Sequence, residues 1–125
     1  MFINKSPSIS PTISPPISLS KVMKLSLGYI TAPTKKEAKE IAMALLEEGL
    51  IACANIIPDV ESFFVWEGQI TASSEVVIIV KTRPVNEKKI IRLVKEMHSY
   101  DCPCITFMSI INGNPDFLKW VDGSC

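Results

Sequence analysis

The chain has 125 residues, and its 13 Lys and Arg residues balance its 13 Asp and Glu residues to a formal net charge of zero. This length is typical of one domain, and an apolar content of 47% is that of a globular protein. A neutral charge argues against a nucleic acid partner, and the lack of a long apolar run argues against a transmembrane helix and a membrane partner.

The first 20 residues contain one charged residue, Lys5, and ten Ser or Pro residues. A four-residue pattern with Pro repeats three times, over residues 6–9, 10–13 and 14–17. Because Pro removes backbone donors and blocks helices, we predict that residues 1–22 form a disordered Ser/Pro-rich arm and that residues 23–125 form the folded domain. The arm lacks the apolar run of a secretory signal and the Arg residues of a transit peptide, so we expect a cytoplasmic protein.

The patterned sequence begins with a strand and a helix. Alternating apolar side chains predict a strand that ends at Pro33: Leu25, Leu27 and Tyr29. Thr34 and Glu37 have the spacing of a capping box, in which Thr34 accepts from a backbone N–H and Glu37 reaches back to another. The helix that follows has an apolar stripe formed by Ala38, Ile41, Ala42 and Leu45. Gly49 is expected to end this helix in a left-handed conformation.

The middle of the chain predicts a pair of strands. Residues 50–66 are rich in β-branched and aromatic types, and Pro58 within them requires an edge position, a bend or a bulge. Glu67-Gly68 predicts a turn, and a further strand follows over residues 75–83. Its centre, Val76–Val80, is apolar on both faces, which is typical of a strand in the middle of a sheet.

A second helix, a fourth strand and a short helix complete the chain. Asn86 is the predicted N-cap of the second helix, whose apolar stripe is formed by Ile90, Leu93, Val94 and Met97. Residues 104–111 predict a strand, and Asn112-Gly113 predicts a turn. Asn114-Pro115-Asp116 then starts a short terminal helix with Pro at its first position.

The order β-α-β-β-α-β plus a short C-terminal helix predicts an α+β fold of the ferredoxin-like type, an antiparallel sheet with two helices on one face. Two helices cover only that face, whereas Val76–Val80 is apolar on both faces and Phe63–Trp66 is more apolar than an alternating pattern allows. We therefore expect another copy of the chain to supply the missing cover, in a homo-oligomer.

Motifs spread over residues 25–122 resemble, in order and spacing, those of the CutA divalent-cation-tolerance family. They are Thr31-Ala32-Pro33, the run from Gly49 to Pro58, Val65-Trp66-Glu67-Gly68-Gln69-Ile70, Ser74-Glu75-Val76 leading into Lys81-Thr82-Arg83, His98-Ser99-Tyr100, and the run from Asn114 to Trp120. The resemblance implies a ferredoxin-like homotrimer similar to the PII signalling trimers, in which the long second and third strands pair between subunits. It also implies a function in tolerance to divalent cations, copper among them.

A copper site is implied as well, formed in bacterial members by a Cys before Thr-Ala-Pro and a His-His pair before Pro-Tyr. In this chain the first position is Ile30, which has no ligand atom, and the pair is Met97-His98, followed by Ser99 in place of Pro. A thioether such as that of Met97 suits Cu(I) better than Zn(II).

Two cysteines indicate a different ligand set. Cys102 and Cys104 are two residues apart, so they project to the same face of an extended chain, and Cys104 stands where the family usually has Glu. Together with His98 and Met97 they could hold a soft metal ion, with copper as Cu(I) as the expected cofactor. The simpler alternatives are that Met97 belongs to the core, that the cysteines are incidental, and that His98 caps its helix.

Further residues are candidates for a ligand-binding cleft between subunits: Tyr100, Trp66, Glu67 and Lys81. Tyr100 lies next to His98 at a helix end, and Lys81 with Arg83 flanks the central strand, where the two cations could bind an anion. The alternatives are that Trp66 anchors an interface, that Glu67 is a turn residue and that the cations are solvated.

Two classes of function follow. The first is a trimeric metal-binding or metal-responsive protein of the CutA type. The second is a PII-like trimeric signalling or scaffold protein whose clefts bind a small ligand or a protein, and the replaced copper ligands favour it. We expect no enzyme, because no nucleophile–base pair can be named. The spacing of Cys53, Cys102, Cys104 and Cys125 does not form a disulfide framework, so we expect free thiols in a reducing compartment.

Overall fold

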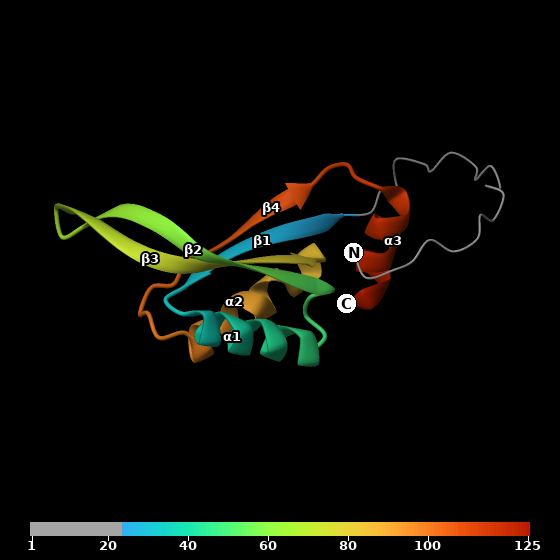
Figure 1. Cartoon of the computed structure of the whole chain (residues 1–125). Helices are drawn as coiled ribbons and strands as arrows, with labels where there is room; N and C mark the ends of the chain where they lie inside the picture. The colour runs from blue at the N-terminus through green and yellow to red at the C-terminus, as the bar shows by residue number, and fades with distance from the viewer. Residues whose placement is uncertain (1–23) are drawn as a thin grey trace, which may run out of the picture.

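The protein is built around a four-stranded antiparallel sheet with the strand order β2-β3-β1-β4 (Figure 1). The computed structural model describes residues 24–125, and the predicted arm over residues 1–22 lies outside them. In chain order the elements are β1 (Leu25–Ala32), α1 (Lys35–Glu47), β2 (Cys53–Trp66), β3 (Gln69–Thr82), the 3-10 turn η2 (Pro84–Asn86), α2 (Glu87–Met97), β4 (Ile105–Ile110) and α3 (Pro115–Ser124). The predicted ferredoxin-like order is confirmed.

The core lies between one face of the sheet and the helices α1 and α2, which run along that face in Figure 1. Alternate side chains of β1 and β3 point into it, and Ile30, Ile78 and Val80 are fully buried there. The predicted stripe of α1 is buried as well: Ala38, Ile41, Ala42 and Leu45. Close packing depends on Gly28, since a Cβ at that position would lie 2.6 Å from Cγ2 of Val80.

Both ends of α1 are closed by the residues that the sequence indicated. The hydroxyl of Thr34 accepts a hydrogen bond from the backbone N–H of Glu37 at 3.1 Å. At the other end Gly49 has a φ of 67°, and the N–H groups of Gly49 and Leu50 donate back to carbonyls of the last turn, as in a Schellman motif. The capping box is only half formed, because the Glu37 carboxylate accepts hydrogen bonds from Ser99 rather than from the N–H of Thr34.

The helix α2 departs from prediction at both ends. Asn86 precedes the helix without capping it, because its side-chain amide donates to the hydroxyl of Thr82 at 3.2 Å. Met97 is 36% exposed, so the interpretation of this residue as part of the core is wrong. The buried residues of α2 are Ile90 and Val94, and Leu93 is partly buried against the core.

A β-bulge divides the long hairpin formed by β2 and β3. Pro58 and Asp59 of β2 together oppose one residue of β3, and Asp59 adopts a positive φ of 58°. The flanking pairs are Ile57 with Val77 and Val60 with Glu75. Of the three alternatives that Pro58 left open, the bulge and the edge position are both present, since β2 is an edge strand of the sheet.

Beyond the bulge the hairpin extends past the helices (Figure 1). Glu67 and Gly68 close it with φ values of 50° and 76°, as in a type I′ turn, and β3 begins at Gln69 rather than near residue 75. Large apolar side chains of this half are exposed: Phe63 by 70%, Val65 by 71%, Trp66 by 62% and Ile70 by 85%. We call residues 60–75 the distal hairpin.

The other face of the sheet is partly covered within the chain. The helix α3 packs against β1 and β3, and its Val121 is fully buried. Val77, which alternates with the core residues of β3, is only 3% exposed. Val77 is thus buried without a second copy, whereas Ile79 on the same face is only half-buried, and the expected cover of this face by another copy stays a prediction. Phe63, Val65, Trp66 and Ile70 form the group of large apolar side chains left exposed on the distal hairpin.

Candidate functional site

The single histidine lies at a point where three elements meet. α2 ends at Met97, and His98 turns the chain into an extended conformation that places its ring against the end of β1. Its Nε2 lies 2.7 Å from the carbonyl oxygen of Thr31, and the backbone N–H of Tyr100 donates to its Nδ1 at 3.0 Å. The side chain of His98 has no exposed surface.

These two contacts fix the protonation pattern of the ring. A carbonyl oxygen only accepts, so Nε2 of His98 carries the proton, and Nδ1 uses its lone pair to accept from Tyr100. Both ring nitrogens are thus engaged within the chain. The expected position of His98 at a helix end is confirmed, but its ring bonds to β1 and to the following loop rather than to the carbonyls that end α2.

Two carboxylates complete the cluster. Oε2 of Glu37 accepts hydrogen bonds from the backbone N–H and the hydroxyl of Ser99, and it lies 3.5 Å from Nδ1 of His98. On the other side, the hydroxyl of Tyr100 donates to Oε2 of Glu75 at 3.3 Å. Burial, followed by the charge of Glu75, raises the pKa of the Tyr100 phenol above its usual value. The cluster therefore links α1, β3 and the loop after α2.

The residues expected to hold copper do not form one shared site within the described chain. Ile30 is fully buried and offers no ligand atom, and His98 has no free lone pair. Cys102 and Cys104 are both exposed free thiols, and Met97 is exposed at the end of α2. Within residues 24–125, no group of three or more His, Cys, Asp or Glu side chains is arranged to hold a metal ion. The ligand set of His98, Cys102 and Cys104 is therefore not assembled.

The remaining cleft candidates lie apart from one another. Trp66 and Glu67 are exposed at the tip of the distal hairpin, whereas Tyr100 belongs to the His98 cluster. Lys81 donates to the side chain of Asn55 at 3.1 Å, and its Nζ lies 5.9 Å from the ring centre of Phe117. Of these cleft candidates, Tyr100 is the one that contacts His98, and Trp66 with Glu67 lies at the hairpin tip.

The second cation of the expected anion site is also engaged. Arg83 lies 3.5 Å from the Asp122 carboxylate and donates to the carbonyl of Cys125 at 3.2 Å. Both contacts join the end of β3 to α3. The interpretation of Arg83 as a solvated cation is therefore too simple, because the residue ties α3 to the sheet.

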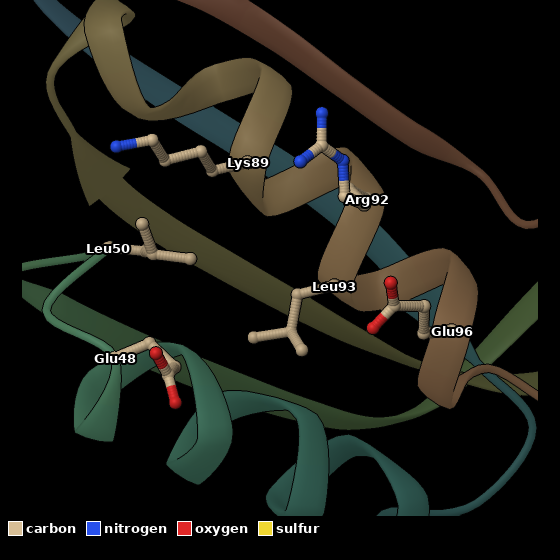
Figure 2. A pocket seen from close by; sticks show the side chains of 6 residues that line it. All are labelled: Glu48, Leu50, Lys89, Arg92, Leu93 and Glu96. Atoms are coloured by element: carbon tan, nitrogen blue, oxygen red, sulfur yellow. The ribbon is translucent and has the colours of Figure 1, made fainter.

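A shallow groove of about 290 Å³ lies between the end of α1 and α2 (Figure 2). Figure 2 shows Lys89 and Arg92 on one part of its rim and Glu96 on another, with Leu93 pointing toward α1. It is lined by Glu48, Leu50, Lys89, Arg92, Leu93 and Glu96. None of the residues predicted for a site lies there, and its mixed charges select no single class of ligand.

A model of the family described as CutA1 divalent ion tolerance protein matches residues 26–124, almost the whole of the described chain. The chain belongs to the CutA1 family. The fold and the sequence motifs agree with this membership. No helix among residues 24–125 is long and apolar enough to cross a membrane.

Relatives of the CutA1 type span archaea, bacteria, animals and plants. The chain is 50% identical over 94 residues to the divalent-cation tolerance protein CutA of Archaeoglobus fulgidus, covering 75% of this chain and 91% of that protein. It is 35% identical over 113 residues to protein CutA of Mus musculus, covering 89% of this chain but 64% of the mouse protein. A relative from Arabidopsis thaliana is described as chloroplastic, and the chain covers 58% of its length.

Solved CutA structures have the same fold. The periplasmic divalent cation tolerance protein CutA of Archaeoglobus fulgidus superposes with a TM-score of 0.77 at 47% identity, covering 80% of this chain and 97% of that one. CutA1 of Oryza sativa gives a TM-score of 0.79 at 34% identity, covering 82% and 94%. Because relatives are described as periplasmic or chloroplastic, the cytoplasmic location of this CutA1 protein stays a prediction.

Sequence reasoning missed the two carboxylates of the cluster. The capping-box pattern places the Glu37 carboxylate at the start of its own helix, and it gives no sign of the hydrogen bonds that this carboxylate accepts from Ser99, after α2. Glu75 gave a clearer signal, since it is a charged residue directly before an apolar run, a position where burial demands a partner. The partner of Glu75, Tyr100, is 25 residues away in sequence and could be assigned only from the fold.

Proposed function

We propose that the protein acts in tolerance to divalent cations, as a homotrimer in the cytoplasm, by binding rather than by catalysis. The observation that carries this proposal is the family match over residues 26–124. It includes the sheet, both packed helices and α3, so the resemblance is not limited to one motif.

The distal hairpin supports the assembly part of the proposal. An isolated two-stranded hairpin is marginally stable in water, yet this one carries exposed Phe63, Val65, Trp66 and Ile70. The register puts Phe63, Val65 and Ile70 together on one face of the hairpin and Trp66 on the other, and an exposed apolar cluster such as the first three marks an interaction site. β2 is moreover a long edge strand whose outer backbone groups can pair with another chain. Identical copies satisfy both requirements, and the resemblance of the sequence to CutA trimers supports three copies.

The assembly is tested by light scattering on the purified full chain. We expect three times the chain mass of 13.8 kDa over a wide range of concentration. A monodisperse monomer contradicts the homotrimer and leaves the tolerance proposal to be tested separately.

The tolerance function is tested in cells of the source organism that lack the protein. We expect such cells to stop growing at lower Cu(II) concentrations than the parent, and the wild-type chain to restore growth. Zn(II) and Co(II) are run in parallel to define the range of cations, and Mg(II) serves as the control. Unchanged growth at every copper concentration contradicts the proposal.

A further inference from the structure

We propose that Cys102 and Cys104 together bind one thiophilic metal ion per chain, Cu(I) being the ion tested, without His98. The inference deepens the proposed function and rests on it for its biological role. It differs from the ligand set expected from the sequence in that the thiols act without the imidazole.

The two cysteines are accessible and held in place at one end. Both are exposed free thiols in the segment between α2 and β4. The N–H of Thr31 donates to the carbonyl of Cys104 at 3.4 Å. This bond continues the pairing of β1 with β4 one residue past Ile30 and Ile105, so Cys104 is anchored to the edge of the sheet.

The residue between the cysteines favours a chelating geometry. Pro103 has a fixed φ, and a residue before Pro is restricted to extended conformations. Only one residue separates the two thiols, at the bend that leads into β4, so both ligand atoms belong to one short stretch of chain. Pro103 also limits the freedom of the loop, which lowers the entropic cost of bringing two ligands to one ion.

Thiolates are the preferred protein ligands of soft ions such as Cu(I). On binding, Cys102 and Cys104 each lose a proton to solvent and form one bond to the ion, which keeps its oxidation state. No oxidant or reductant is consumed. His98 adds nothing to this set, because its Nδ1 accepts from Tyr100 and its side chain is fully buried.

The other two thiols provide a matched control, because the chain itself engages them. Cys53 is partly buried, and burial raises its pKa, which disfavours the thiolate. The Sγ of Cys125 donates to the carbonyl of Val121 at 3.4 Å and lies 3.8 Å from the hydroxyl of Thr82. A Cys53→Ser/Cys125→Ser variant therefore removes the same number of sulfur atoms from a different part of the molecule.

The experiment is an anaerobic titration of the full chain with Cu(I) in competition with a coloured Cu(I) chelator. We expect one Cu(I) per chain for the wild type and for Cys53→Ser/Cys125→Ser. We expect Cys102→Ser/Cys104→Ser to bind at least about 100-fold more weakly, since even changes outside the ligand shell cost 10- to 100-fold. His98→Gln should bind like the wild type, and unchanged light scattering and circular dichroism verify that each variant is folded.

Three results overturn the site. They are no binding by the wild type, equal binding by all variants, and a loss in Cys53→Ser/Cys125→Ser that matches the loss in Cys102→Ser/Cys104→Ser. A loss confined to a folded His98→Gln variant overturns the claim that the thiols act alone. The growth assay separates this inference from the proposed function: normal tolerance in cells lacking the protein defeats the function while leaving a measured Cu(I) site intact.

Discussion

The two halves of β3 differ in what lies over them, although both pair with β2 throughout. Val76, Val77, Ile78 and Val80, after the bulge position, are buried in the single chain, whereas Ile70 is 85% exposed. The backbone ladder is continuous apart from the bulge, so pairing alone does not bury side chains. Strand pairing and side-chain burial are therefore independent of each other. Within the single chain, only the half of β3 that faces α1 and α2 has most of its side chains buried.

The largest expected effect comes from charging the distal hairpin. A Phe63→Asp/Val65→Asp variant places two carboxylates on a surface that is apolar in the wild type, and burying them against another copy would leave them unpaired. We expect the mass measured by light scattering to fall from three chains to one. Met43→Asp, on an exposed position of α1, is the control and should keep the wild-type mass. If the doubly charged variant keeps that mass too, the distal hairpin is not the interface.

The buried half of β3 can be weakened by one substitution. Ile78 has no exposed surface, so Ile78→Ala leaves a cavity that should lower the free energy of unfolding by about 2–5 kcal/mol. Urea denaturation followed by circular dichroism measures the loss. The same chemical change in Ile111→Ala, where the side chain is almost fully exposed, should cost less than about 0.5 kcal/mol. Equal costs for the two variants would contradict the buried position of Ile78.

An added methyl group on β1 should also disturb the packing against the buried half of β3. In Gly28→Ala the new methyl group would lie 2.6 Å from Cγ2 of Val80 and 3.0 Å from the ring of Phe107, so the core must shift. We expect the free energy of unfolding to fall by about 1–3 kcal/mol. Gly123→Ala in α3 meets no atom within 4 Å and should leave stability unchanged or raise it by up to about 1 kcal/mol.

The smallest effect concerns Glu75, which lies at the junction of the two halves. Burial raises the pKa of Tyr100 most, and the charge and hydrogen bond of Glu75 raise it further. In Glu75→Gln we therefore expect an absorbance titration of the phenol to move partway back toward lower pH. Because the folded-state pKa is raised, the contribution of Tyr100 to folding is present below about pH 10 and lost as the pH rises through the folded value. Glu61→Gln is the control, and an equal shift there contradicts the contact.

The sequence predicted features that depend on a few neighbouring residues. The stripe and both caps of α1 and the Glu67-Gly68 turn follow from local backbone chemistry, and all are present. Pro58 indicated an edge position, a bend or a bulge, and the fold decided among them. The first half of β3 was missed, because Gln69–Ser74 is mostly polar and pairs only with the aromatic half of β2. No local pattern distinguishes such a segment from a loop.

The candidate site was less predictable, because its contacts join distant parts of the chain. That His98 lies at a helix end could be derived from its neighbours, but its bond to Thr31, 67 residues away, could not. The same bond, together with the one from Tyr100, removes the imidazole from the expected metal ligands. Residue types indicated which atoms could bind copper. Only the fold showed which of these atoms already take part in hydrogen bonds within the chain.

The bulge at Pro58 and Asp59 changes the phase of β2. Before it, the odd-numbered residues of β2 share a face with Ile79, and after it the even-numbered residues share that face. One additional residue thus turns Phe64 and Trp66 to one side of the hairpin and Phe63 and Val65 to the other. Deleting it would exchange these pairs without altering a single aromatic side chain. The number of residues in β2 therefore decides which side chains each face of the distal hairpin carries, and insertions or deletions near residue 58 should be tolerated less well than substitutions there.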